Sequence, residues 1–168
     1  MDICIRPITI SDAAQYIELG QQLDQETKFM LLEPGERSLD IQKQKDILQS
    51  ILKASNKIIF VAETKAKLVG YIAVFGGNFK RNYSTAQIVI GVLQAYTGQG
   101  LGRELFAEVF QWATAHHLHR LELTVMAHNE NALSLYQKQG FVIEGVKKDS
   151  LLLDGDFVDE YYMGRLLN

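Results

Sequence analysis

Residues 88–110 place a strand, a glycine-rich turn and a helix in direct succession, and no other stretch constrains the fold as much. Residues 88–93 are almost all β-branched or aliphatic, which is typical of a buried strand. Gly98, Gly100 and Gly102 follow, and apolar residues at helical spacing continue beyond them. Because glycines allow close backbone approach and the first N–H groups of a helix lack internal partners, this junction can hold an anion such as a pyrophosphate. The alternative is a connector in which the glycines only permit the turn.

Two common phosphate-binding motifs do not fit these glycines. A dinucleotide-binding GxGxxG that begins at Gly98 needs another glycine at the sixth position, where this chain has Arg103. A P-loop, which reads GxxxxGK followed by Ser or Thr, occurs nowhere in the sequence. The phosphate interpretation therefore requires a different motif.

The glycine turn resembles the pyrophosphate-binding loop of the GNAT N-acetyltransferase superfamily, which reads (Q/R)xxGx(G/A) after a strand that ends in valine. Gly100 and Gly102 stand at its two small positions and Val92 at the strand position. Thr97 stands where the family has Gln or Arg, so one long side-chain donor is missing. The resemblance implies that acetyl-CoA is the cosubstrate and that backbone N–H groups of this loop bind it. The implied binding residues are Val92, Leu93, Thr97, Gly98, Gln99, Gly100, Leu101, Gly102 and Arg103.

A second motif begins at Asn129, where NENALSLYQKQGF resembles the NxxAxxLYxxxGF signature of the same superfamily. Asn129 follows a predicted strand, where its side chain can cap the next helix while its amide reaches a cofactor group. Ala132 permits close approach, and Tyr136, two helical turns after Asn129, lies on the same helix face. Taken singly, Asn129 is equally well a simple cap and Tyr136 a core residue. Together with the glycine turn, the motif predicts acetyl-CoA binding by Asn129, Ala132 and Tyr136.

Transfer of an acetyl group to an amine requires two proton movements. A free alkylamine has a pKa of ~10, so a base or a chain of waters must remove a proton at neutral pH. The departing thiolate must in turn be protonated. The resemblance implies that Tyr136 is the general acid, and that backbone N–H groups near Val92 and Leu93 hold the thioester carbonyl.

The sequence leaves the general base open. Some members of the superfamily carry a glutamate at the strand position that Thr124 occupies here. Glu122 lies two residues earlier, on the same face of the strand, and is the candidate catalytic base, acting through water. The alternative is that Glu122 is a structural ion-pair partner of Arg120 or Arg103. The weaker candidates are Glu63 and His128.

The composition limits the class of protein. With 168 residues and 47% hydrophobic content, the chain suits one domain, residues 1–168, with a sizeable core. A net charge of −3 argues against a nucleic-acid partner. Cys4 is the single cysteine, no signal peptide is evident and no apolar run approaches the ~18 residues of a membrane span, so a cytoplasmic protein with no membrane partner is expected. His116, His117 and His119 lack the companions of a recognisable ligand set, so no metal is expected.

The periodicities predict a mixed α/β architecture. Strands are expected at residues 3–8, 57–63, 68–75, 88–93, 120–125, 141–153 and 157–166. Helices are expected at residues 13–23, 38–55, 101–112 and 129–139. This order predicts a mixed, mostly antiparallel sheet of about seven strands with helices on both faces, and it is also the order of the GNAT fold.

Two variable parts of this fold are expected to choose the acceptor, namely the loop at residues 29–37 and the hairpin at residues 147–159. The hairpin resembles that of a bacterial subgroup that acetylates free amino acids or other small amines, and that of acetyltransferases of ribosomal-protein N-termini. The sequence therefore predicts an N-acetyltransferase of a primary amine, with a small molecule such as an amino acid as acceptor. A protein N-terminus or lysine as acceptor and a non-catalytic acyl-CoA-binding domain are the alternatives. A homodimer through the terminal strands is left open.

Overall fold

The computed structural model describes residues 2–168, which form seven strands, four α-helices and two short 3₁₀ turns. The strands are β1 (Cys4–Pro7), β2 (Lys57–Thr64), β3 (Lys67–Gly76), β4 (Thr85–Val92), β5 (Arg120–Met126), β6 (Val142–Leu153) and β7 (Asp156–Leu166). The helices are α1 (Ala13–Glu26), α2 (Ile41–Lys53), α3 (Leu101–Ala115) and α4 (Glu130–Lys138). The 3₁₀ turns are η1 (Ile10–Asp12) and η2 (Gln94–Tyr96). The predicted order of strands and helices is confirmed.

The strands form one sheet in the order β1-β2-β3-β4-β5-β7-β6. Each neighbouring pair is antiparallel except β4 and β5, which run parallel. The chain leaves β4, passes through α3 and returns as β5, which is the long crossover that a parallel pair requires. The predicted mixed, mostly antiparallel sheet of seven strands is therefore confirmed.

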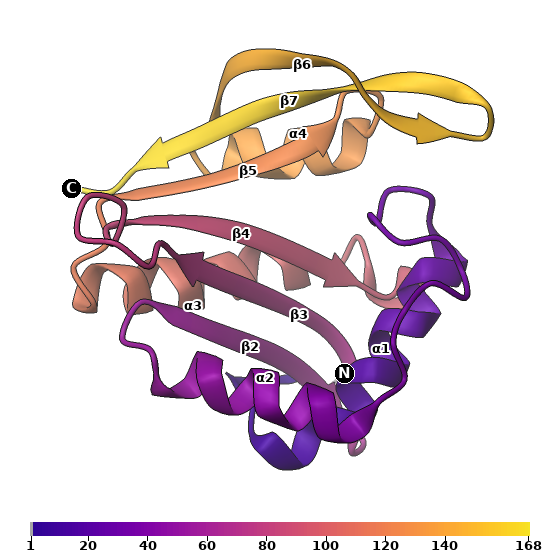
Figure 1. The fold of residues 1–168 in the computed structure, drawn as a ribbon, viewed down its shortest axis with the longest axis vertical. Helices are drawn as coiled ribbons and strands as arrows, with labels where there is room; N and C mark the ends of the chain where they lie inside the picture. The colour runs from indigo at the N-terminus through magenta and orange to yellow at the C-terminus, as the bar shows by residue number, and fades with distance from the viewer. Residues whose placement is uncertain (1) are drawn as a thin grey trace.

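The parallel pair is joined over only a short part of its length. Residues 85–87 of β4 pair with residues 120–122 of β5, and no pairing of these two strands follows. β4 stays paired with β3 as far as Val92, and β5 with β7 as far as Met126. The two strands therefore diverge, as Figure 1 shows, and leave a gap in the middle of the sheet. Backbone groups on this side of β4 have no strand opposite them.

Helices cover both faces of the sheet, as predicted. α1 and α2 pack beside each other on one face, and Figure 1 shows α2 in front of the sheet and α3 behind it. Tyr16 of α1 meets Tyr71 of β3 edge-on, with ring centroids 5.4 Å apart. On the other face, Phe106 of α3 meets Tyr136 of α4 with ring centroids 5.9 Å apart. The fully buried Phe106 and Phe141 belong to the core that joins α3 and α4 to the sheet.

Several helix boundaries differ from the prediction by two or three residues, and two of these differences have identifiable reasons. α1 continues to Glu26, three residues beyond the predicted end, and its last residue is held by side-chain bonds. Glu26 accepts hydrogen bonds from Gln22 Nε2 at 2.9 Å and from the Gln94 N–H at 2.9 Å. α2 begins three residues later than predicted, because Asp40 is its N-cap and accepts a bond from the Lys43 N–H at 3.0 Å.

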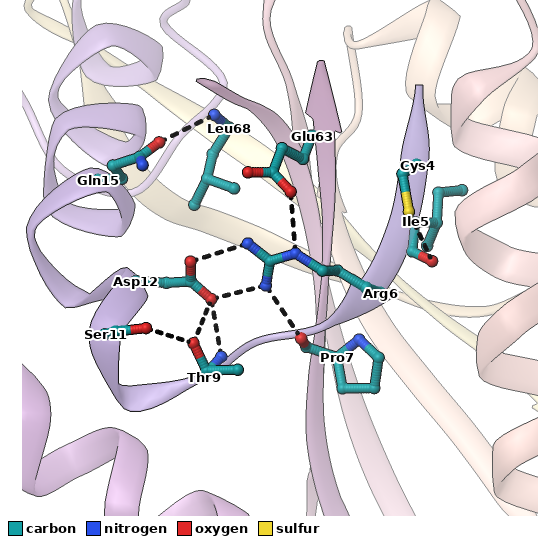
Figure 2. A network of polar contacts seen from close by, with 10 residues as sticks. All are labelled: Cys4, Ile5, Arg6, Pro7, Thr9, Ser11, Asp12, Gln15, Glu63 and Leu68. Carbon is teal, nitrogen blue, oxygen red and sulfur yellow. Dashed lines mark hydrogen bonds and ion pairs between the residues drawn. The ribbon is translucent and has the colours of Figure 1, made fainter. Parts of the chain in front are cut away.

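The start of α1 depends on Asp12, its N-cap residue, whose side chain makes no capping bond to the helix itself. Thr9 begins η1, and its N–H donates to Asp12 Oδ2 at 2.8 Å. Figure 2 shows Arg6 of β1 between two carboxylates, donating to Asp12 at 2.8 Å and to Glu63 at 3.0 Å. The hydrogen bond from Arg6 lowers the pKa of Asp12 to about 2. Arg6 thus ties the first strand and the first helix to β2.

Candidate functional site

Gly98 and Gly100 shape the turn between β4 and α3. Their φ angles are +73° and +85°, in the left-handed region that favours glycine. A Cβ added at Gly98 would touch nothing within 4 Å, and one added at Gly100 would meet only the Arg103 side chain at 3.8 Å. The turn therefore presents an exposed backbone with open space beside it.

The backbone N–H groups of residues 98–103 donate no hydrogen bond within residues 2–168. Those of residues 101–103 belong to the first turn of α3, which offers them no acceptor. The first bond of the helix runs from the Glu104 N–H to the Gly100 carbonyl at 3.1 Å. Consecutive free N–H groups at the positive end of a 15-residue helix form a binding surface for an anion.

The polar side chains of the turn differ in whether their hydrogen-bond donors are free to bind a ligand. Thr97 donates its hydroxyl to the Gln94 carbonyl at 2.8 Å, and Gln99 donates Nε2 to the Ala95 carbonyl at 3.2 Å. Arg103 is exposed and makes no ion pair with the described part of the chain. Among the predicted loop residues, Arg103 therefore offers the charged donor, while Thr97 turns back onto its own backbone.

Leu101 and Gly102 connect the turn to the rest of the fold. Leu101 is buried in the core. A Cβ added at Gly102 would lie 2.9 Å from Leu135 Cδ2, so this glycine lets α4 approach the first turn of α3. Gly102, which the sequence assigned to the binding loop, thus also has a packing role.

Asn129 caps α4 through its oxygen. Its Oδ1 accepts a bond from the Ala132 N–H at 3.4 Å, and its Nδ2 donates no bond within residues 2–168. Ala132 is half-buried and packs against the core. Capping by Asn129 is confirmed, and a cofactor role for its amide nitrogen and for Ala132 stays a prediction.

Tyr136 has a buried ring and a hydroxyl without a partner. Its ring packs against Phe106, with centroids 5.9 Å apart, and against Phe141 at 6.3 Å. The hydroxyl makes no hydrogen bond within residues 2–168, yet it is not among fully buried polar atoms, so it reaches accessible space. Burial raises the pKa of Tyr136 above its ordinary value, and the phenol of Tyr71 raises it further. The phenol is therefore protonated at neutral pH and able to donate.

Val92 and Leu93 point their N–H groups in opposite directions. The Leu93 N–H donates to the Val69 carbonyl of β3 at 2.9 Å. Because the N–H groups of neighbouring strand residues point to opposite edges, that of Val92 faces the gap between β4 and β5. Of the two N–H groups predicted to hold a carbonyl oxygen, that of Leu93 is thus already occupied. The register with β3, which the sequence does not reveal, decides this.

Tyr71 was missed by the sequence analysis, although it lies beside the separated part of β4. It pairs with Gly91, where an added Cβ would come 2.9 Å from Tyr71 Cε1 and 2.7 Å from Leu23 Cδ1. Burial raises the pKa of Tyr71 to about 12. The available signal was Gly91 itself, because a glycine inside a strand often marks close approach of another group.

Glu122 lies at the closed end of the gap. It pairs with Gln87, the last residue of β4 that is joined to β5. Its Oε2 accepts a bond from Arg120 Nε at 2.9 Å, so the structural alternative, a partner for Arg120, is observed. Val92 lies five residues beyond Gln87, about 17 Å further along the strand. A catalytic role for Glu122 stays a prediction.

The weaker candidate bases, and the strand position where some relatives carry a glutamate, lie in different surroundings. At that position, Thr124 is exposed on the part of β5 that no longer pairs with β4. Glu63 lies on β2, two strands away from β4 in the sheet, and forms an ion pair with Arg6 of β1. His128 is exposed after β5, and its ring lies 5.1 Å from the ring of Phe29. These placements bring none of the weaker candidates into contact with Tyr136.

The two segments predicted to choose the acceptor approach each other across the gap. Phe29, in the loop between α1 and α2, contacts His128. Lys28 forms an ion pair with Asp154 at the tip of the β6–β7 hairpin. Figure 1 shows this loop beneath the hairpin tip. The loop and the hairpin therefore border the same opening.

The histidines at the end of α3 have structural contacts. His116 Nδ1 lies 2.8 Å from the Trp112 carbonyl, and the two rings stack with centroids 4.3 Å apart. Within residues 2–168, no group of three or more His, Cys, Asp or Glu side chains is arranged to hold a metal ion. In the same range, no helix is both long enough and apolar enough to cross a bilayer.

Proteins of similar sequence include two acetyltransferases of Escherichia coli (strain K12). The chain is 32% identical over 110 residues to the L-amino acid N-acetyltransferase, covering 63% of this chain and 66% of that protein. It is 30% identical over 89 residues to the ribosomal protein uS5-alanine N-acetyltransferase, covering 52% and 46%. The chain thus matches about two thirds of the first relative and less than half of the second.

Solved structures extend the likeness over the whole fold. The GNAT-family acetyltransferase of Streptococcus pneumoniae has a TM-score of 0.95 and 30% identity, covering 99% of this chain and all of that one. A putative acetyltransferase of Salmonella typhimurium, solved with its cofactor acetyl-CoA, has the same fold, with a TM-score of 0.86, 19% identity and coverage of 99% and 94%. The family model described as "Acetyltransferase (GNAT) family" matches residues 21–141, a range that contains both motifs. The chain therefore belongs to the GNAT acetyltransferase family.

Proposed function

We propose that the protein is an N-acetyltransferase that transfers the acetyl group of acetyl-CoA to the primary amine of a small molecule such as an amino acid. The run of free N–H groups at residues 98–103 carries this proposal, because it offers a seat for a pyrophosphate at the start of α3. Family membership and the name of the amino-acid relative support the same activity.

The residues present fit acetyl-CoA. Open space beside Gly98 and Gly100 leaves the N–H groups accessible, and Arg103 adds a positive charge with no ion-pair partner within residues 2–168. The Asn129 amide nitrogen and the half-buried Ala132 line the helix face that bears Tyr136. When bound, acetyl-CoA supplies a thioester that is activated toward amines.

Each proton and charge in direct transfer has a residue suited to it. The Val92 N–H, which faces no strand, stabilises negative charge on the carbonyl oxygen as the amine attacks. Tyr136, kept protonated by burial, donates its proton to the departing sulfur. Water in the gap takes the amine proton and passes it to solvent or to Glu122 at the closed end of the gap, so Glu122 is not the direct base.

A small acceptor is favoured over a protein by the borders of the opening. The contact between Phe29 and His128 and the ion pair between Lys28 and Asp154 join the α1–α2 loop to the far side of the gap. A folded protein would have to displace these contacts to bring an N-terminus to β4, whereas a small amine needs less room.

Thiol release from acetyl-CoA tests the proposal. Free amino acids, polyamines, aminoglycosides and short peptides with free N-termini are supplied as separate pools, beside a control without acceptor. Release above the control with one small-molecule pool, lost in Tyr136→Phe, supports the proposal. Release with peptides alone would move the acceptor to protein N-termini. No release from any pool, with acetyl-CoA still raising the melting temperature, would favour the non-catalytic alternative.

A further inference from the structure

The side chain of Arg37, in the loop between α1 and α2, is fixed by two residues of α1, Asp24 and Gly20. Its Nε and Nη2 donate to Asp24 at 2.8 and 2.9 Å, and the Asp24 side chain is only 2% exposed. The guanidinium lies close against Gly20, where an added Cβ would come 2.6 Å from Nε and 2.7 Å from Cζ. A glycine inside a helix is less favourable than alanine, so this position favours the approach of Arg37 over helix stability.

The contact with Asp24 uses one edge of the guanidinium and leaves another free. An arginine has five N–H donors, and the pair with Asp24 occupies the edge formed by Nε and Nη2. Nη1 donates no bond within residues 2–168. The edge formed by Nη1 and the second Nη2 hydrogen therefore remains for a second planar acceptor. A carboxylate fits this edge through two parallel hydrogen bonds.

A small polar cavity lies at this position. Its volume is about 30 Å³, and its lining residues are Tyr16, Ile17, Gly20, Arg37, Gln44 and Tyr71. The hydroxyls of Tyr16 and Tyr71 make no hydrogen bond within residues 2–168 and are not fully buried. One water needs about 10–15 Å³, so the cavity has room for about two oxygen atoms. Its size and its donors suit the head of one carboxylate.

Tyr71 joins this cavity to the site of acetyl transfer. Its ring lies against Gly91 in the separated part of β4, while it also lines the cavity with Arg37. The charge of Arg37 opposes the effect of burial on the Tyr71 pKa, and Tyr71 in turn raises that of Tyr136. Tyr71 therefore lies between the cavity that holds Arg37 and the separated part of β4.

We propose that Arg37, with the hydroxyls of Tyr16 and Tyr71, binds a carboxylate of the acceptor, so that the acceptor is an amine with a carboxylate close to its amino group. This inference rests on the proposed N-acetyltransferase activity and narrows it to free amino acids and similar zwitterions. Polyamines lack the carboxylate. Protein N-termini carry an amide at that place. Asp24 orients Arg37 and is a positioning residue.

The test compares each amino acid with its carboxamide, which keeps the side chain and the amine but removes the carboxylate. We expect the wild type to prefer the acid by at least about tenfold in kcat/KM, the effect of losing hydrogen bonds to a charged group. The amine of the carboxamide is less basic and so more often neutral and reactive. Amine basicity alone would therefore favour the carboxamide, so a preference for the acid must come from recognition of the carboxylate. Arg37→Lys retains a charge beside Asp24 but lacks the planar fork, and should bring the ratio close to one.

Two further variants separate recognition from folding. Gly20→Ala displaces the guanidinium without changing any charge and should lower the same ratio. Asp24→Asn with Arg37→Met removes both members of the pair, so no buried charge is left alone. A merely structural Arg37 would lower kcat/KM for acids and carboxamides equally, and that result would overturn the inference.

Failure of this inference differs from failure of the proposed function. Equal rates for acids and carboxamides in the wild type would reject carboxylate binding by Arg37 but would still support the N-acetyltransferase activity. If no acceptor reacts, the proposed function fails, and carboxylate binding is then tested without turnover. The probes are the deaminated carboxylic acids, added with CoA while melting temperature is followed. A rise in wild type that Arg37→Lys abolishes supports carboxylate binding by Arg37, and no rise rejects it.

Discussion

The ring of Tyr71 lies against the backbone of Gly91, so closely that a Cβ added there would come within 2.9 Å of Tyr71 Cε1. Leu23 of α1 closes the same place from the other direction, with its Cδ1 at 2.7 Å. The glycine therefore lets a strand, a helix and a phenol meet beside the gap between β4 and β5. Three elements depend on the absence of one methyl group.

Replacing this glycine should cost both stability and activity. We expect Gly91→Ala to lower the free energy of unfolding by about 1–3 kcal/mol, because overpacking forces Leu23 and Tyr71 to move. The kcat of the folded protein should also fall, because Tyr71 is displaced, and this loss is separate from the loss of folded protein. Urea denaturation and steady-state kinetics measure the two effects. Gly145→Ala is the matched control, since its Cβ would find Tyr162 at an ordinary 3.8 Å.

The positive φ of Gly100 should matter most to acetyl-CoA binding. Gly100→Ala strains the turn by about 1–2 kcal/mol and disturbs the free N–H groups that follow it. We expect the dissociation constant of acetyl-CoA, measured by calorimetry, to rise about tenfold or more. Gly155→Ala introduces similar strain at a φ of +86°, with nothing within 4 Å of the added Cβ, but in the distal hairpin. Equal loss of affinity in both variants would contradict a specific role for the turn.

Removing the Tyr136 hydroxyl should separate binding from chemistry. In Tyr136→Phe we expect kcat to fall about 100-fold or more, the scale of general acid catalysis, with little change in acetyl-CoA affinity. The ring contacts with Phe106 and Phe141 are kept, so the fold should remain intact. Tyr83→Phe, at a surface hydroxyl bonded to Ser55, serves as the control. An unchanged rate would remove Tyr136 as the acid.

Stability should fall steeply in alkali. Burial raises the pKa of Tyr16, Tyr71 and Tyr136 above the ordinary value of 10.0. In the unfolded chain the same phenols ionise near pH 10, so the unfolded state binds fewer protons there. Their stabilising contribution is thus full below pH 10 and is lost above it, by about 1.4 kcal/mol per pH unit for each ionising group. Urea denaturation between pH 8 and 11 should show a smaller slope for Tyr16→Phe than for wild type.

Glu122→Gln tests the candidate base. Because Glu122 is paired with Arg120 at the closed end of the gap, we expect kcat to change by less than about threefold. Stability should fall by less than about 1 kcal/mol, as for a partly exposed ion pair. A loss of about 100-fold in kcat, with a shifted acidic limb of the pH profile, would instead assign the base to Glu122.

Local pattern sufficed for the order of elements and for the two motifs. Strands and helices are recognised from the spacing of apolar residues close together in the sequence, as in the apolar run before Gly98 and the apolar residues at helical spacing after it. Asp154 and Gly155 both adopt positive φ, in agreement with the predicted hairpin turn. The capping residue Asn129 was likewise visible, because a cap acts on its own helix.

Long-range register accounts for most of what the sequence did not reveal. Leu93 and Val92 are both apolar, and only pairing with β3 shows which N–H is occupied. Glu122 shares a strand face with Thr124, but its distance from the site follows from the three-residue pairing of β4 with β5. The sequence predicts a loop at Arg37 and a helix that ends at residue 23, one residue before its partner Asp24, so the pattern does not reveal the pair.

From residue 88 onward, β4 pairs with β3 on one side only, so its other side is an unpaired edge although the strand lies in the middle of the sheet. Exposed edges invite other chains to pair with them, and proteins usually guard them with charge, proline or a bulge. The segment Ile88-Val89-Ile90-Gly91-Val92 has none of these, and its protection comes instead from lying recessed between two halves of the molecule. The free backbone donors and acceptors along this part of β4 are therefore spaced to pair with an extended molecule as they would with another strand.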